Sequence, residues 1–212
     1  MQQELFRRGG KRAGAGRKPK NGRAGVSHAR REEVRASWPV HVTMRVAYGL
    51  YLRKRSIWRA IAKATTAAAK TIRVVHASVQ HDHLHVLVEA SDRAALTKGM
   101  LAFQVSAAHW INRAAKRSGR VFPDRYHAHV IKTPREARSA IRYVLSNWRK
   151  HGEAAHCRWA IDPFSTGYAF WAEERPPRDY EPLPIAAPGC WLLRIGWQRA
   201  GAISPYDVPG QK

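Results

Sequence analysis

The sequence predicts an α+β fold: a ferredoxin-like antiparallel sheet in the order strand, helix, strand, strand, helix, strand, followed by one added helix. Two observations carry this prediction. Four segments have the pattern of strands, two of them with apolar residues that alternate with a period of two, and apolar residues recur at helical spacing in three others. We expect two helices to cover one face of the sheet and the other face to stay open.

The first half of this order lies in residues 39–88. Residues 39–46 place Val40, Val42, Met44 and Val46 on one face, which predicts a half-buried strand. Residues 53–70 are rich in Ala, Lys and Arg with apolar residues at helical spacing, which predicts a helix. Residues 72–79 and 83–88 are two apolar runs joined by three residues, as in a β-hairpin.

The second half begins at Asp92, from which an apolar stripe at helical spacing runs towards Gly119 and predicts a long helix. Residues 125–132 predict a short fourth strand. Pro134 suits the first turn of a helix and Gly152 suits its end, so the added helix is expected between them.

Composition indicates a polyanionic partner. The chain has 38 Lys and Arg against 15 Asp and Glu, a formal charge of +23, which favours nucleic acid over an anionic membrane surface or an acidic protein. Apolar runs of about 18 residues are absent from the sequence, as is an apolar secretion segment at the N-terminus, so we expect no membrane contact and an intracellular protein. Cys157 and Cys190 fit neither a disulfide framework nor a zinc site.

Three segments differ in composition. Residues 1–36 are basic and glycine-rich and are expected to form a disordered arm, in which Arg17, Lys18 and Lys20 neutralise phosphates. Residues 37–152 hold the predicted sheet and helices. Residues 153–212 are rich in proline and end in an apolar cluster, so we expect an extension that packs on the domain.

Four residues are candidates for chemistry. His83 and His85 alternate with the apolar side chains of their strand, so both point away from the core and can share a cation. Tyr143 and Asn147 are four residues apart on the last helix, off its apolar stripe. Surface histidines and a half-buried tyrosine explain the same pattern without function. His127-Ala128-His129 is a competing histidine pair.

These residues lie in motifs that resemble the REP-associated tyrosine transposases, a group within the HUH single-tyrosine transposases of bacterial insertion sequences. The resemblance spans about residues 37–170, and the motifs stand in the family's order. They are the stretch from Ser78 to Glu89 around His83-Leu84-His85, residues 122–127 (FPDRYH), and residues 133–147 from Thr133-Pro134-Arg135-Glu136 to Tyr143-Val144-Leu145-Ser146-Asn147. Asp82 and Trp148 depart from residues common in relatives, which have asparagine and proline there, but neither departure removes a ligand.

The resemblance implies a metal-dependent endonuclease and strand transferase that acts on single-stranded DNA or DNA hairpins through a 5′-phosphotyrosine. It implies Tyr143 as the nucleophile, His83, His85 and Asn147 as ligands of Mg²⁺ or Mn²⁺, and a bacterial, nucleoid-associated location, as monomer or homodimer. Imidazole by itself favours softer ions. Eight basic residues near these motifs are expected to bind the DNA: Arg125, His127, Lys132, Arg135, Arg138, Arg142, Arg149 and Lys150.

Two other functions stay open at this point. A relaxase or rolling-circle initiator would share the histidine pair and the tyrosine, but the short chain and the order of the motifs disfavour it. A catalytically inactive or domesticated protein that binds DNA hairpins would keep the fold without cleaving DNA.

Overall fold

The computed structural model describes residues 32–210 and contains the predicted antiparallel sheet. Its strands lie in the order β2-β3-β1-β4. The strands are β1 (Val40–Arg45), β2 (Arg73–Val79), β3 (His83–Glu89) and β4 (His127–Val130). The long helices are α1 (Arg55–Ala68), α2 (Arg93–Ala114) and α3 (Pro134–Lys150). The predicted fold class is therefore confirmed, and the fourth strand is shorter than expected.

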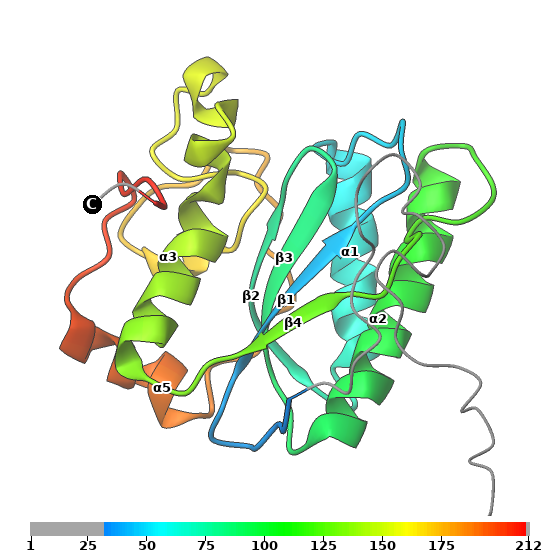
Figure 1. The fold of residues 1–212 in the computed structure, drawn as a ribbon. Coiled ribbons are helices and arrows are strands. Elements are labelled where there is room, and N and C mark those ends of the chain that lie inside the picture. The colour runs from blue at the N-terminus through cyan, green and yellow to red at the C-terminus, as the bar shows by residue number, and fades with distance from the viewer. Residues whose placement is uncertain (1–31, 211–212) are drawn as a thin grey trace, which may run out of the picture.

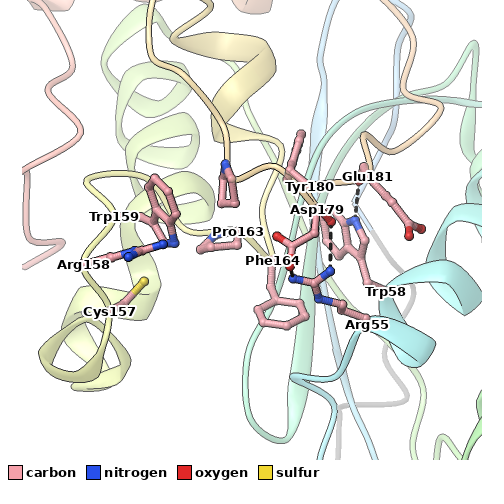
Figure 2. A pocket seen from close by; sticks show the side chains of 11 residues that line it. Arg55, Trp58, Cys157, Arg158, Trp159, Pro163, Phe164, Asp179, Tyr180 and Glu181 are labelled. Carbon is pink, nitrogen blue, oxygen red and sulfur yellow. Dashed lines mark hydrogen bonds and ion pairs between the residues drawn. The ribbon is translucent and has the colours of Figure 1, made fainter.

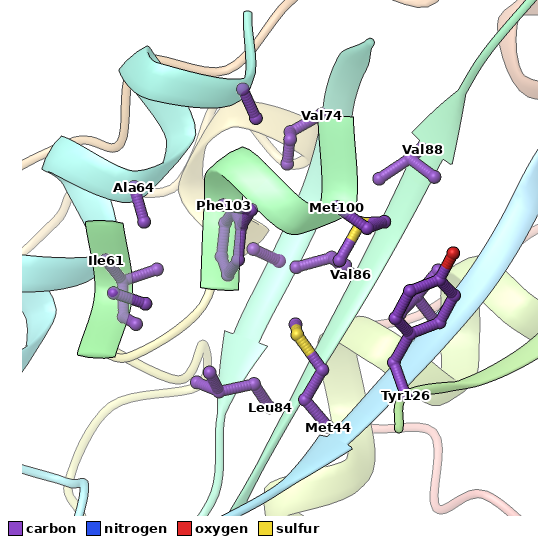
Figure 3. Packing of buried hydrophobic residues seen from close by; sticks show 14 of the residues in the cluster. Met44, Ile61, Ala64, Val74, Leu84, Val86, Val88, Met100, Phe103 and Tyr126 are labelled. Carbon is purple, nitrogen blue, oxygen red and sulfur yellow. The ribbon is translucent and has the colours of Figure 1, made fainter. Parts of the chain in front are cut away.

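The face of the sheet that meets α1 and α2 forms the larger hydrophobic core. The apolar residues that alternate along β1 and β3, such as Val42 and Val86, are buried against Ile61 of α1 and Phe103 of α2. Figure 3 shows Val86, Ile61 and Phe103 together, with the ring of Tyr126 on the same side of the sheet. The alternation in the sequence thus predicted which side of β1 and β3 faces α1 and α2.

The opposite face is covered in part, which corrects the expectation of an open face. Figure 1 shows the sheet between α1 and α2 on one side and α3 on the other. Val75 of β2 and Leu87 of β3 are buried against Ile141 and Leu145 of α3. The apolar stripe of α3 needs an apolar partner, and the second face of β2 and β3 supplies it. Only the part over β1 and β4 remains accessible.

Residues 153–210 run along β2 and beside α3. They include four short helical turns: η2 (Glu153–His156), α4 (Gly167–Phe170), α5 (Trp191–Arg194) and η3 (Gly196–Ala200). The amide of Thr166 donates to Ala77 O (2.9 Å), and the amide of Ala186 donates to Val74 O (2.8 Å). The extension thus pairs with the outer edge of β2.

A buried ion pair fastens the extension to the start of α1. Arg53 donates to both carboxylate oxygens of Asp162, at 3.0 and 2.9 Å, and also to Val79 O at 2.8 Å. Asp162 is fully buried. None of the helices within residues 32–210 is long and apolar enough to cross a membrane.

Candidate active site

A cavity of about 690 Å³ lies between α3 and the accessible part of the sheet. Five histidines from three strands line it: His41 of β1, His83 and His85 of β3, and His127 and His129 of β4. The antiparallel register places His41 opposite His129 and Thr43 opposite both His85 and His127. Side chains at paired positions share a face, so this face of the sheet is rich in imidazole.

The structure brings the four predicted chemical residues together: His83, His85 and Tyr143 line this cavity, and Asn147 is buried behind His85. Asn147 Nδ2 lies 3.1 Å from His85 Nε2. The rings of Tyr143 and His85 are 5.0 Å apart between centroids, and those of His83 and His85 are 4.7 Å apart. The two pairs come from β3 and α3, which are far apart in the chain. Their chemical roles stay a prediction, but their proximity is a property of the fold.

The start of α3 is fixed by a capping box, and this positions Tyr143 and Asn147. The amide of Glu136 donates to the hydroxyl of Thr133 (3.2 Å), and Glu136 accepts from the amides of Lys132 (2.7 Å) and Thr133 (3.1 Å). Such a cap stabilises a helix end by roughly 1 kcal/mol. The helix then carries Tyr143 and Asn147 one turn apart, both towards the sheet.

Each histidine of β3 has a protein partner at Nδ1. His83 Nδ1 lies 2.6 Å from Asp82 Oδ1, and His85 Nδ1 lies 3.1 Å from Thr43 Oγ1 and 3.2 Å from His41 Nε2. Metal-binding histidines usually have such a partner, which fixes the ring and directs the other nitrogen at the metal. Nε2 of both rings is therefore the atom that would face a cation; in His85 it lies 3.1 Å from Asn147 Nδ2.

Burial keeps His85 neutral. Burial first, and then the neighbouring His41, His83 and His151, hold the pKa of His85 well below its usual range. Burial and the two histidines of β4 lower the pKa of His41 to about 4. A neutral imidazole has the lone pair that metal binding requires. The low pKa of His85 therefore suits a side chain that binds a metal cation.

Asn147 has an unsatisfied oxygen. Its side chain is fully buried, and among the described residues its Oδ1 has no hydrogen-bond partner. A buried amide oxygen without a partner costs about 1–3 kcal/mol, and a bound ion is one remedy. The two ends of the amide exchange by a half-turn about the Cβ–Cγ bond, so the oxygen can also face His85.

The donor set therefore fits a divalent cation: two imidazole nitrogens and a buried amide oxygen without a partner among the described residues. Within residues 32–210, no group of three or more His, Cys, Asp or Glu side chains is arranged to hold a metal. The predicted set depends on Asn147 as its third member. The competing pair, His127 and His129, is exposed on β4 and lines the same cavity.

Sequence reasoning missed four residues of the cavity. His41, Thr43 and Arg45 alternate with the buried residues of β1 and share the face of His85. The period-two rule that selected His83 also applies to them, so the signal was present in the sequence. His151 follows the last residue of α3, and its ring lies 5.2 Å from that of His83. Its place depends on how α3 crosses the sheet, which no local pattern reveals.

Three other tyrosines near the predicted domain could compete as nucleophile, and the structure places each of them away from the histidines. Tyr126 is buried in the core on the α1 and α2 side of the sheet (Figure 3). Tyr168 is buried and its hydroxyl donates to Ile161 O. Tyr48 is fully exposed on the loop after β1. Tyr143 alone of these four lines the histidine cavity.

The predicted DNA-binding residues fall into separate groups. His127 and Arg135 line the cavity, and Lys150 lies 5.9 Å from the centre of the Tyr143 ring. Arg138 and Arg149 instead donate to backbone carbonyls of the C-terminal extension. Those donors hold the chain's own backbone, so a phosphate role for these two arginines has no support in the geometry.

The remaining members of the predicted set have other surroundings. Arg125 is exposed just before β4. Lys132 forms an ion pair with Glu32 and lies 5.2 Å from the ring centre of Trp38. The Nε of Arg142 is buried and has no hydrogen-bond partner within the described residues. Arg17, Lys18 and Lys20 lie outside the described residues.

A second cavity, of about 310 Å³, lies between α1 and the C-terminal extension. Figure 2 shows two interactions across it: Arg55 pairs with Asp179, and Trp58 Nε1 donates to Glu181 O at 2.6 Å. It shares no lining residue with the histidine cavity. We interpret it as part of the contact that holds the extension on α1.

Comparisons with known proteins agree with this geometry. The family described as "Transposase IS200 like" matches residues 40–147, from the first residue of β1 to Asn147. The fold resembles that of a REP-associated tyrosine transposase bound to a REP hairpin, with a TM-score of 0.56 and 16% sequence identity over 77% of this chain and 93% of that chain. A bacterial tRNA(His) guanylyltransferase-like protein in complex with GTP gives a TM-score of 0.40 at 16% identity over 57% and 64% of the two chains, too low to support an argument. No curated protein matches the sequence.

Proposed function

This chain belongs to the IS200-like transposase family, and we propose that it cuts and rejoins single-stranded DNA with a divalent metal through a 5′-phosphotyrosine at Tyr143. The observation that carries the proposal is that Tyr143 and Asn147 of α3 both contact His85 of the histidine pair on β3. Membership of the transposase family establishes that the chain is an enzyme of the transposase kind. The tyrosine chemistry, the metal and the single-stranded substrate are the proposed part.

Tyr143 is proposed as the nucleophile. Its hydroxyl oxygen attacks the scissile phosphorus and forms a phosphotyrosine bond, while the bond to the 3′-oxygen of the preceding nucleotide breaks. The tyrosine proton is lost in this step, and the leaving oxygen takes up a proton to become a 3′-OH. One phosphodiester replaces another of similar energy. A 3′-OH from a second strand can therefore reverse the step and join the strands without ATP.

His83, His85 and Asn147 are proposed to hold the metal, with Mg²⁺ or Mn²⁺ favoured because phosphate and water oxygens complete the coordination. When bound, the cation would polarise the scissile phosphate and offset the charge that develops on it. The chain's own residues do the rest. Asp82 and Thr43 fix the two imidazole rings, and the rigid turn of α3 holds Tyr143 at a constant distance from Asn147.

Single strands and hairpins are the proposed substrates. The net charge of +23 supplies the attraction to phosphates, and the fold neighbour binds a REP hairpin. The cavity is open enough for an extended strand, and Arg45, His127 and Arg135 line it. We propose that these three side chains, with Lys150 beside Tyr143, contact the phosphates around the cut.

The decisive experiment detects the covalent adduct. Repeats that flank the gene, made as hairpin oligonucleotides labelled 3′ of the expected cut, are incubated with the protein and Mn²⁺ and run on a denaturing gel. We expect a labelled protein band that EDTA abolishes, with the label on the peptide that contains Tyr143. If the hairpins bind tightly but no adduct or nick forms, the protein is a hairpin-binding module that has lost the chemistry.

A further inference from the structure

The loop after β1 presents two tyrosines to solvent beside the histidine cavity. We name residues 46–54 the tyrosine loop. Tyr48 is fully exposed, and Tyr51 is 41% exposed. With Arg45, His81 and Asp82 they line a cavity of about 530 Å³. A large aromatic side chain that stays exposed to water gives up the favourable free energy of burial. Two of them on one loop therefore suggest a binding site.

The tyrosine loop is built to hold these rings outwards. Leu50 and Leu52, on either side of Tyr51, are buried and anchor the loop in the core. The amide of Val46 donates to Asp82 O (2.9 Å) and that of Leu52 to His81 O (3.0 Å), which ties the loop to the β2–β3 turn. Gly49 has a φ of +82°, a conformation that glycine adopts without strain. The loop is therefore preorganised.

The cavity at the tyrosine loop adjoins the candidate active site. Arg45 lines both cavities. Asp82 lines the loop cavity and accepts a hydrogen bond from His83 of the histidine cavity. A strand with its scissile phosphate at Tyr143 could thus continue past Arg45 to the loop.

The chemistry of the loop matches an unpaired nucleobase. The ring of Tyr51 is already held edge-on to His81, at 4.8 Å between centroids, and Lys54 Nζ lies 5.9 Å from its centre. Arg45 and Lys54 are exposed cations on either side of the tyrosines. Aromatic faces bordered by cations bind single strands by stacking on the bases and neutralising the phosphates.

We propose that Tyr48 and Tyr51 form a stacking site for one or two unpaired nucleotides next to the scissile phosphate. The site takes a base by its flat face, so it favours no particular base. Any sequence preference of the enzyme must then arise elsewhere. The inference rests on the proposed function, because it places the strand relative to Tyr143, but it concerns binding and not cleavage.

The test measures binding of the full chain to fluorescein-labelled oligo(dT) by fluorescence anisotropy, in EDTA, so that no cleavage contributes. Tyr48→Ala should weaken binding roughly tenfold, equivalent to about 1.4 kcal/mol. Tyr48→Trp should retain the affinity because the indole also stacks. The matched control is Tyr206→Ala, which removes another exposed tyrosine, 66% exposed, in the C-terminal extension and should change nothing.

A second arm separates stacking from charge. An oligonucleotide of abasic sites keeps the phosphates and lacks the bases, so wild type and Tyr48→Ala should bind it equally. Equal loss on both strands, or unchanged binding of oligo(dT) by Tyr48→Ala, would overturn the inference.

Photo-crosslinking locates the site. Oligo(dT) with one 5-bromodeoxyuridine should crosslink to the peptide of the tyrosine loop, and a crosslink confined to other peptides would count against it. If the Tyr48 effect is present but no phosphotyrosine adduct forms in metal, the stacking site stands and the proposed cleavage fails. If an adduct forms but Tyr48→Ala does not weaken binding, the proposed cleavage stands and the stacking site fails.

Discussion

Tyr143→Phe removes one oxygen and separates chemistry from structure. The ring of Tyr143 packs edge-on to His85 and His41, at 5.0 and 5.6 Å between centroids, and phenylalanine keeps both contacts. Within the described residues the hydroxyl takes part in no hydrogen bond, so its loss leaves no partner unsatisfied. We therefore expect the free energy of unfolding to change by less than about 0.5 kcal/mol, which is a melting shift of about 1–2 °C.

The same substitution should abolish the covalent adduct. Without the oxygen no phosphotyrosine can form, so the labelled protein band on the denaturing gel should disappear while the affinity for hairpin DNA stays within about twofold. Tyr126→Phe is the matched control, because it makes the same change at a tyrosine in the opposite core and should leave the adduct intact. An adduct in Tyr143→Phe, or its loss in Tyr126→Phe alone, would refute the assignment.

Three further predictions follow from the described contacts. Mn²⁺ at about a hundred times its dissociation constant should stabilise the wild type by about 2.7 kcal/mol, measured as a rise in melting temperature. His83→Ala should lose this rise and His127→Ala should keep it. The opposite result would place the metal on β4. Asp162→Ala removes the bidentate partner of the buried Arg53, which keeps Glu153 Oε2 at 3.4 Å, and should cost about 3 kcal/mol, or roughly 10 °C in melting temperature; a drop below about 2 °C would contradict this. Burial lowers the pKa of His76 to about 4, so between about pH 6.5 and pH 4 the unfolded chain binds more protons than the folded chain. The free energy of unfolding should therefore fall by up to about 3 kcal/mol as the pH is lowered through this range. His76→Leu should reduce this pH dependence in urea titrations at several pH values.

The local order of the fold could be predicted from the sequence because each element buries one face. Val42 and Val86 follow the strand period, and Ile61 and Phe103 follow the helix period, so the core against α1 and α2 was predictable. The prediction failed where burial is two-sided. β2 and β3 are covered on both faces, and alternation shows which face is more apolar, not whether the other is exposed.

The candidate site was predicted in part for the same reason. His83 and Asn147 could be found because they lie on regular elements and off the apolar positions. The ring contact of His151 with His83 and the hydrogen bond from Arg138 to Ala202 O depend on packing between segments that are distant in the sequence. The sequence predicts that a cationic side chain on a helix can bind phosphate. The tertiary structure shows whether its donors already bind a backbone carbonyl oxygen of the same chain.

The C-terminal extension has a consequence for where this protein can be divided. β2 is an outer strand of the sheet, and Phe164, Thr166 and Ala186 hydrogen-bond along its free side. A chain ended at residue 152 would expose these backbone groups together with apolar surface on α3, the combination that leads strands of different molecules to join. The part matched by the family, residues 40–147, thus leaves out the segment that covers the free side of β2. Recombinant work on the catalytic chemistry should keep the chain at least to residue 210.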